Sequence, residues 1–224
     1  MTALWLQSAP GPETAYTARH PAASEARHTL GMANLFPRIE GPDPAHGAWI
    51  AEVQRFWFEE LKPWQWFRAD PVLDETLRQR FGDLYRSLVE QGALALNPQA
   101  ALARVIVFDQ FPRNMFRGQS EAFASDALAL LTSQEAIAAG FDAKLNQPER
   151  QFLYMPFQHS EDRDAQQRSV ELFTALGGEE AARSARQHQD IVERFGRFPH
   201  RNAILGRVST PKEIEFLKTA PPFG

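Results

Sequence analysis

The sequence predicts an all-α protein of about 6–8 helices joined by short connections. From Asp43 onward, apolar residues recur at the spacing of helices that face a common core. Helix start signals that contain proline, such as Asn97-Pro98, punctuate this pattern. No segment alternates as a β-strand does, and the apolar run RVIVF at 104–108 fits a helix better. The fold class therefore follows from periodicity and from caps.

Each predicted helix has a start or stop signal of its own. Gly92 ends the second helix, and Pro112 should stop the third because proline has no N–H to donate. Ser120 and Ser160 are expected to cap the fourth and sixth helices, and Thr210 begins a capping box before the last. In chain order, we expect helices over 49–61, 73–91, 97–111, 120–140, 148–157, 160–177, 181–195 and 211–217.

Residues 1–45 differ from the rest of the chain. They hold six of the 16 prolines and show little apolar periodicity. Such a segment buries too little surface to offset its ordering entropy. We interpret 1–45 as a flexible leader, or as the product of a start codon placed too early, and 46–224 as a single all-α domain.

Composition limits the classes of function. The chain has no cysteine, which excludes disulfides, thiolate metal sites and cysteine catalysis and fits a cytoplasmic location. A net charge of -4 gives no reason to expect a nucleic-acid partner, and no apolar run is long enough for a membrane span. We expect no cofactor and no bound metal, and the oligomeric state stays open.

Two stretches, FDQFPRNMFRG at 108–118 and RFGRFPHRNAILGR at 194–207, place arginines and an asparagine around Phe-Pro. In each stretch, Phe-Pro lies at the end of a predicted helix. The last carbonyls of a helix are unpaired and carry partial negative charge. The simplest interpretation is structural, with arginines and amides satisfying two helix ends.

The density of arginine favours a second interpretation, an anion-binding pocket. Residues 193–207 hold four arginines and one histidine but a single acid, and arginine pairs with carboxylate or phosphate through a fixed fork. We expect the two stretches to converge in space beside the acidic stretch HSED at 159–162. The candidate ligand-binding residues are Arg113, Asn114, Arg117, Glu161, Asp162, Arg197, Arg201 and Asn202.

Histidines beside carboxylates suggest acid–base chemistry. His159 directly precedes Ser160, Glu161 and Asp162, and His200 lies between Pro199 and Arg201. A histidine near carboxylates has the composition of a general base. The candidate catalytic residues are His159, His200 and Asp109. A metal site is disfavoured because no helix offers two ligands at metal-binding spacing.

Four blocks together resemble a known family. FWFEE…WF at 56–67, FDQFPRNMFRG at 108–118, FLYMPFQHSED at 152–162 and RFGRFPHRNAILGRVSTPKEIEFL at 194–217 are similar to the bacterial domain-of-unknown-function 924 family. The resemblance covers about 48–217. It implies a tetratricopeptide-like array of antiparallel helix pairs and carries over no catalytic assignment.

Three functions remain open from the sequence. The protein binds a small anionic molecule or peptide, which we favour, or it is an enzyme that acts on a carboxylate- or phosphate-bearing small molecule. In the enzyme, His159 or His200 would be the acid/base. The third possibility is that the polar network is purely structural.

Overall fold

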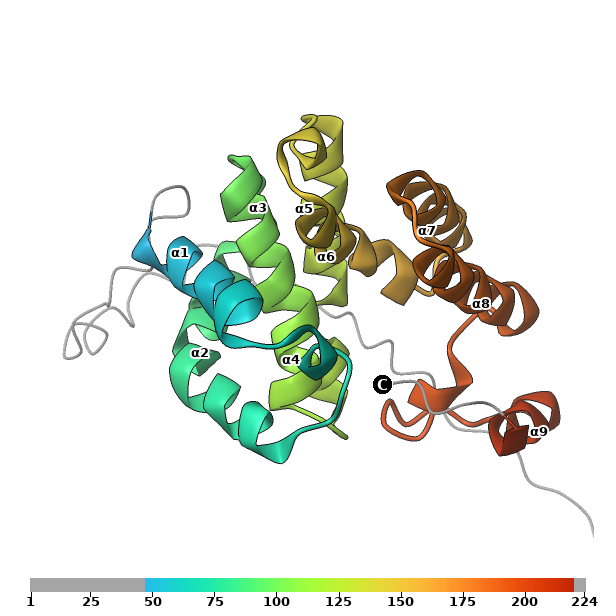
Figure 1. The fold of residues 1–224 in the computed structure, drawn as a ribbon. Coiled ribbons are helices and arrows are strands. Elements are labelled where there is room, and N and C mark those ends of the chain that lie inside the picture. Colours follow the sequence, from blue (N-terminus) through green and yellow to red (C-terminus); the bar gives the residue numbers. More distant parts are fainter. Residues whose placement is uncertain (1–46, 220–224) are drawn as a thin grey trace, which may run out of the picture. The chain divides into compact units, whose positions relative to one another are not determined.

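The expected helical pattern is confirmed along residues 47–219, the part of the chain that the computed structural model describes. These residues form α, 3-10 and π turns without a β-strand, so the fold is all-α (Figure 1). They all belong to one compact unit, Gly41–Gly224. The predicted leader, 1–45, lies outside the described residues, and the tetratricopeptide-like arrangement stays a prediction.

The first half of the described chain contains two helical stretches that each include a π turn. The first stretch ends with its π turn, whereas the second continues beyond its π turn as α-helix. The elements are α1 (Ala48–Arg55), η1 (Phe56–Glu60), η2 (Pro63–Gln65), α2 (Pro71–Gln91), α3 (Pro98–Val105), η3 (Ile106–Gln110) and α4 (Phe111–Met115).

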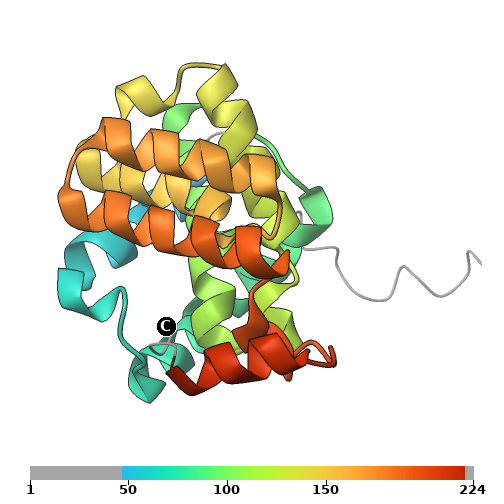
Figure 2. The same cartoon turned by 90° about the vertical axis from the view of Figure 1, so that its right-hand side faces the viewer.

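The second half contains α6, α7 and α8, which pack in sequence and lie side by side in Figure 2. A loop then leads to α9. The elements are η4 (Ser120–Phe123), α5 (Asp126–Ala138), η5 (Asp142–Lys144), α6 (Gln147–His159), α7 (Arg163–Leu176), α8 (Glu179–Phe195), η6 (Pro199–Arg201) and α9 (Pro211–Thr219).

Several predicted boundaries are confirmed by hydrogen bonds. The Asn97 side chain accepts from the Ala100 amide at 2.8 Å and so caps α3. Gly92 ends α2 with a positive φ of 81°. The capping box before α9 is present, because Thr210 N–H donates to Glu213 and Glu213 N–H donates to the Thr210 hydroxyl.

Three boundaries were predicted wrongly. Pro112 does not stop its helix but lies in the first turn of α4. Ser120 begins the short η4, and α5 starts only at Asp126. Ser160 follows the end of α6, and Asp162 caps α7 by accepting from Ala165 N–H at 2.8 Å. In the last case two helices meet two residues later than expected, which leaves His159 as the final residue of α6.

The main hydrophobic core forms around α3, which packs against α1, α5 and α6. All eight of its residues except Pro98 and Gln99 are buried. Trp57 contacts Phe111 and Phe152 with ring centroids 5.8 and 5.5 Å apart. A smaller cluster of Ile191, Val192 and Phe198 supports the loop after α8. Within the described residues, no helix is long and apolar enough to cross a membrane.

Candidate active site

Asp109 lies in the π turn η3, and Pro112 accounts for the local backbone. Phe111 N–H donates to Ile106 O, five residues back, which widens the turn. Because Pro112 has no N–H, the carbonyl of Phe108 lacks its ordinary donor four residues later. The Ser125 hydroxyl donates to this carbonyl at 2.6 Å instead. The proline is thus accommodated inside a buried helix, and the Asp109 side chain is fully buried.

The residues after Pro112 serve the next two carbonyls. Arg113 Nη1 donates to Asp109 O at 2.6 Å, and the Asn114 amide donates to Gln110 O at 2.9 Å. The structural interpretation of the first Phe-Pro stretch therefore holds for these two contacts. It does not cover Arg113 completely, because this side chain also binds carboxylates.

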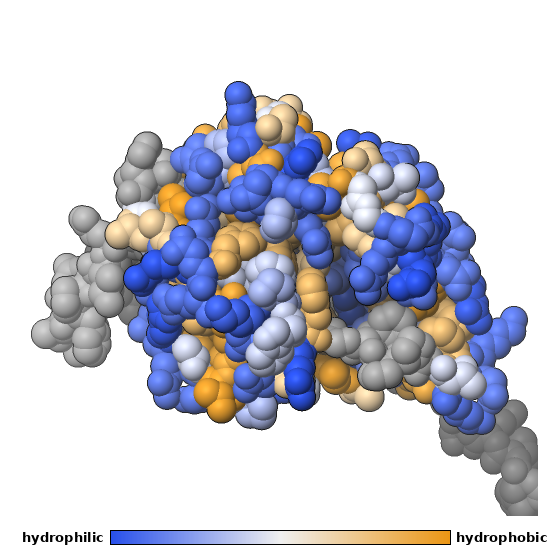
Figure 3. Space-filling model, in the orientation of Figure 1, coloured by the Kyte–Doolittle hydropathy of each residue, from blue (hydrophilic) through white to orange (hydrophobic). Residues whose placement is uncertain are grey.

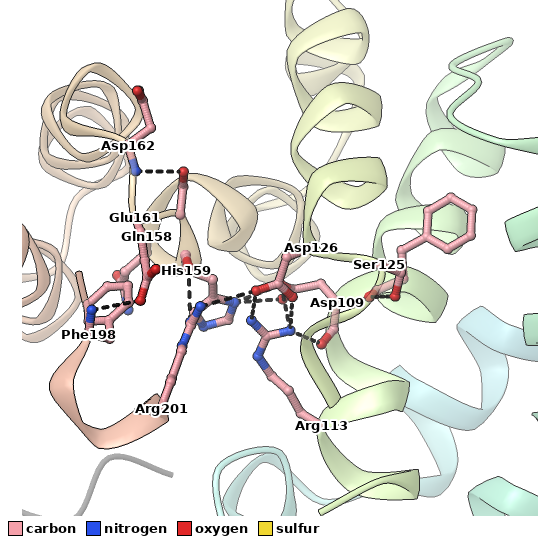
Figure 4. Close-up of polar contacts among 12 residues, drawn as sticks. Asp109, Arg113, Ser125, Asp126, Gln158, His159, Glu161, Asp162, Phe198 and Arg201 are labelled. Atoms are coloured by element: carbon pink, nitrogen blue, oxygen red, sulfur yellow. Dashed lines mark hydrogen bonds and ion pairs between the residues drawn. The ribbon is translucent and has the colours of Figure 1, made fainter. Parts of the chain in front are cut away.

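His159 comes from α6 and meets Asp109 across the core. Its Nδ1 lies 2.7 and 2.9 Å from the two carboxylate oxygens of Asp109 (Figure 4). A carboxylate accepts only, so Nδ1 carries the hydrogen and Nε2 carries the lone pair. Nε2 has no hydrogen-bond partner among residues 47–219 and is not sealed from solvent. The side chain as a whole is 17% exposed.

Two arginines converge on Asp126 next to this pair (Figure 4). Arg113 holds Asp126 with two hydrogen bonds, at 2.9 and 3.1 Å, and its Nη1 also lies 3.1 Å from the Asp109 carboxylate. Arg201 reaches the same Asp126 carboxylate at 3.3 Å and donates to the backbone carbonyl of His159 at 3.0 Å. The predicted convergence of the two Phe-Pro stretches beside His159 is therefore confirmed.

The electrostatics favour a neutral histidine beside a charged carboxylate. Burial, helped by the charge of Arg113, lowers the pKa of His159 below its ordinary value, although Asp109 acts in the opposite direction. Burial alone would raise the pKa of Asp109, but Arg113 and His159 hold that pKa well below its usual range. At neutral pH the pair is thus an Asp109 carboxylate and a neutral imidazole with Nε2 available as a base.

The second Phe-Pro stretch is fastened to the site by Glu161. This carboxylate accepts from Phe198 N–H at 2.7 Å and from Arg207 at 2.6 and 2.9 Å. Arg207 also donates to Asn202 Oδ1 at 3.0 Å. Glu161 and Asn202 therefore shape the loop that carries Arg201 and do not contact His159 themselves.

The remaining two candidate arginines bind carboxylates outside the Asp109–His159 cluster. Arg117 forms two hydrogen bonds with Asp74 on α2, at 2.9 and 3.0 Å. Arg197 forms two with Glu213 on α9, at 2.7 and 2.9 Å. Each of these pairs ties a Phe-Pro stretch to a neighbouring helix.

Two other candidates lie outside the Asp109–His159 cluster. Asp162 was expected to pair with an arginine, but it caps α7 and forms no ion pair within residues 47–219. His200 lies against the ring of Phe198, 5.5 Å between centroids, and contacts neither Asp109 nor Asp126. Burial lowers the pKa of His200 to about 4. Asp109 and His159 are therefore the pair that the geometry joins.

Several residues of the site were missed from the sequence. Asp126 is the carboxylate shared by two arginines, yet in the sequence it reads as an ordinary acid at a helix start. Gln110 donates to the Asp109 carboxylate at 2.5 Å, and Phe123 lies beneath Arg201. Only Arg207 had a visible signal, the Arg beside Gly206 at the end of the second stretch.

A surface depression of ≈ 360 Å³ lies elsewhere, between α5, α6 and α7. Figure 3 shows the surface hollowed between α5 and α7. Ile137 and Phe157 contribute to its lining, with Asp164 and Arg168 from α7. None of the Asp109–His159–Arg201 cluster lines it. Among the described residues, no three histidine or carboxylate side chains group in a way that would hold a metal ion.

Comparison with known proteins gives the family. The sequence pattern of the family described as "Bacterial protein of unknown function (DUF924)" matches residues 53–221. The chain belongs to this family. All residues of the site fall inside the matched range, so the site is part of the DUF924 region.

A solved structure is also similar to the chain. The chain is 39% identical to a protein of unknown function, ATU0120, from Agrobacterium tumefaciens, with a TM-score of 0.70. The match covers 76% of this chain and 97% of the other chain. No curated protein matches the sequence. The family and the neighbour thus support the fold and name no reaction.

Proposed function

We propose that this DUF924 protein is an enzyme in which His159 acts as general base through Nε2 and Asp109 orients it. The observation that carries this proposal is the hydrogen bond between His159 Nδ1 and the fully buried Asp109 carboxylate, at 2.7 Å. The bond fixes the tautomer and directs the lone pair away from Asp109. A neutral imidazole in this state accepts a proton from water or from a substrate near neutral pH.

Arg113 and Asp126 would hold the pair in place. Arg113 contacts the carboxylates of both Asp109 and Asp126, so it fixes the position of Asp109 relative to the helix that follows. In this role Arg113 and Asp126 are positioning residues. His159 is the catalytic residue of the proposal. We propose a cytoplasmic location, with which a chain without cysteine is compatible.

A second candidate function is the binding of a small anionic molecule or peptide without catalysis. The existing ion pairs of the arginines argue against it. Arg113, Arg117, Arg197 and Arg207 each already form two hydrogen bonds with one carboxylate. A set of arginines dedicated to binding a ligand would leave more donors unpaired. The observation in its favour is Arg201, whose contact with Asp126 is longer and shared.

Hydrolysis of p-nitrophenyl acetate at pH 7 tests the base, because a neutral imidazole catalyses the hydrolysis of activated esters. In His159→Gln we expect the rate of hydrolysis to fall to the background set by the other histidines of the chain. In Asp109→Asn we expect the rate to fall partly. Arg117→Lys, outside the site, serves as the matched control and should keep the rate of the wild type. An unchanged rate in a folded His159→Gln variant would contradict the proposal.

A further inference from the structure

Arg201 differs from the other arginines around the site in how it is held. Its residue is 7% exposed, so it is almost fully buried. Its guanidinium lies between two aromatic rings, 4.6 Å from the centroid of Phe123 and 4.6 Å from that of Phe198. Such a stack fixes the plane of the guanidinium and removes water from its faces.

The charge of Arg201 is also the least satisfied among the arginines around the site. Its Nε is buried and has no hydrogen-bond partner among the described residues. Its carboxylate partner, Asp126, is bound more closely by Arg113, at 2.9 and 3.1 Å, than by Arg201, at 3.3 Å. Burial lowers the pKa of Arg201 to about 10, which reflects the same lack of compensating charge.

We propose that Arg201 binds the carboxylate or phosphate group of a small anionic substrate and places it beside His159. Arg201 donates to the His159 backbone carbonyl at 3.0 Å, so the anion-binding group lies beside the residue that carries the base. This inference rests on the proposed function for the identity of the base, but the binding of an anion is measurable without any reaction.

Arg201 would exchange its contact with Asp126 for one with the anion when the anion binds. In the free protein Asp126 neutralises part of the charge of Arg201, whereas its two hydrogen bonds with Arg113 persist without Arg201. An incoming anion therefore competes with one long contact only. The exposed parts of His159, Arg113 and Asp126, 17, 17 and 21% of their side chains, mark the side from which it would approach.

Titration calorimetry of the full-length chain tests the inference, with inorganic phosphate in one arm and malonate in the other at constant ionic strength. Saturable binding of either anion to the wild type is expected, and the arm that binds identifies the chemistry. Arg201→Lys should weaken that binding about tenfold or more, because lysine cannot reproduce the fork. The control Arg117→Lys should bind as the wild type does.

A second variant tests the same point by a gain of binding. Asp126→Asn removes the carboxylate that competes for Arg201, so it should bind the anion more tightly than the wild type. His159→Gln should still bind the anion while losing ester hydrolysis, which separates failure of this inference from failure of the proposed base. Absence of binding in both arms, or equal binding by the wild type, Arg201→Lys and Asp126→Asn, would overturn it.

Discussion

The two Phe-Pro stretches have similar sequences but different structures. Around Pro112 the helix continues through a π turn, and side chains of Ser125, Arg113 and Asn114 serve the carbonyls on either side. Before Pro199 the helix ends at Gly196, in the left-handed conformation with φ of 69°. A proline beside arginines thus marks either a helix that bends or one that stops, according to what surrounds it.

The two stretches nevertheless use two of their arginines in the same way. In each, one arginine faces inward and reaches Asp126, Arg113 from the first and Arg201 from the second. A second arginine of each stretch faces outward and binds a neighbouring helix, Arg117 to Asp74 and Arg197 to Glu213. We conclude that the inward pair belongs to the network around Asp109 and Asp126, whereas the outward pair fastens each stretch to a neighbouring helix. The following predictions test this division.

The largest effect is expected for Arg113→Ala. This change leaves Asp109, which is fully buried, with no cationic partner among the described residues, because the neighbouring His159 is neutral. Removing one partner of a buried ion pair costs about 3–5 kcal/mol of unfolding free energy. Urea denaturation measures it, with Arg201→Ala as the comparison: Asp126 keeps Arg113 there, so the loss should be smaller. Equal losses of unfolding free energy in the two variants would contradict this order.

The next effect is a pH dependence that separates the two regions. Burial lowers the pKa of His188 and of His200 to about 4 each, whereas the ordinary histidine value is 6.5. The unfolded chain therefore binds protons first as the pH falls, and stability declines between pH 6.5 and about 4. Each histidine contributes about 3 kcal/mol to this decline.

Asp109 acts in a different pH window. Its pKa is depressed, so its contribution is complete above the ordinary aspartate value of 3.8 and is lost only as the pH falls below it. Denaturation across this pH range in His188→Asn should show a shallower loss between pH 6.5 and 4 and an unchanged loss below 4. A wild-type stability that stays flat down to pH 4 would be inconsistent with buried neutral histidines.

A smaller effect is expected for Asn114→Ala, which removes the amide that donates to Gln110 O inside the core. An unsatisfied buried carbonyl costs about 1–3 kcal/mol. Thermal melting measures the loss, and Gln119→Ala at an exposed position provides the control. A melting temperature equal to that of the control would show that the π turn does not depend on Asn114.

The most local effect is expected for Arg197→Ala. Arg197 holds α9 through Glu213 and through Val208 O at 2.9 Å. Its loss should speed amide hydrogen exchange in residues 211–219 while exchange in α3 stays as slow as in the wild type. Faster exchange throughout the core would show that Arg197 supports more than α9.

The elements of the fold were predictable because their signals are local. The cap at Asn97 and the capping box at Thr210 depend on residues only three apart, and the chain itself brings these together. Pro112 was misjudged because the donor that satisfies Phe108 O is Ser125, which reaches it only through tertiary packing.

The site was partly predictable for the same reason. The arginines, Asp109 and His159 were visible as residue types at unusual density, but the choice of partner was not. Arg201 and Asp126 are 75 residues apart, and no periodicity relates them. Asp162 was expected to bind an arginine, but the capping of its own helix, a local interaction, determines its contacts.

The central claim is that His159 is a neutral base held by Asp109, and nitrogen-15 NMR of the histidine side chains tests it most directly. The His159 signals, assigned by comparison with His159→Gln, should show at pH 7 a protonated Nδ1 and an unprotonated Nε2. In Asp109→Asn this tautomer should lose its preference, because an amide can donate to Nδ1 as well as accept from it. A charged imidazolium at pH 7, or a hydrogen on Nε2 in the wild type, would contradict the account.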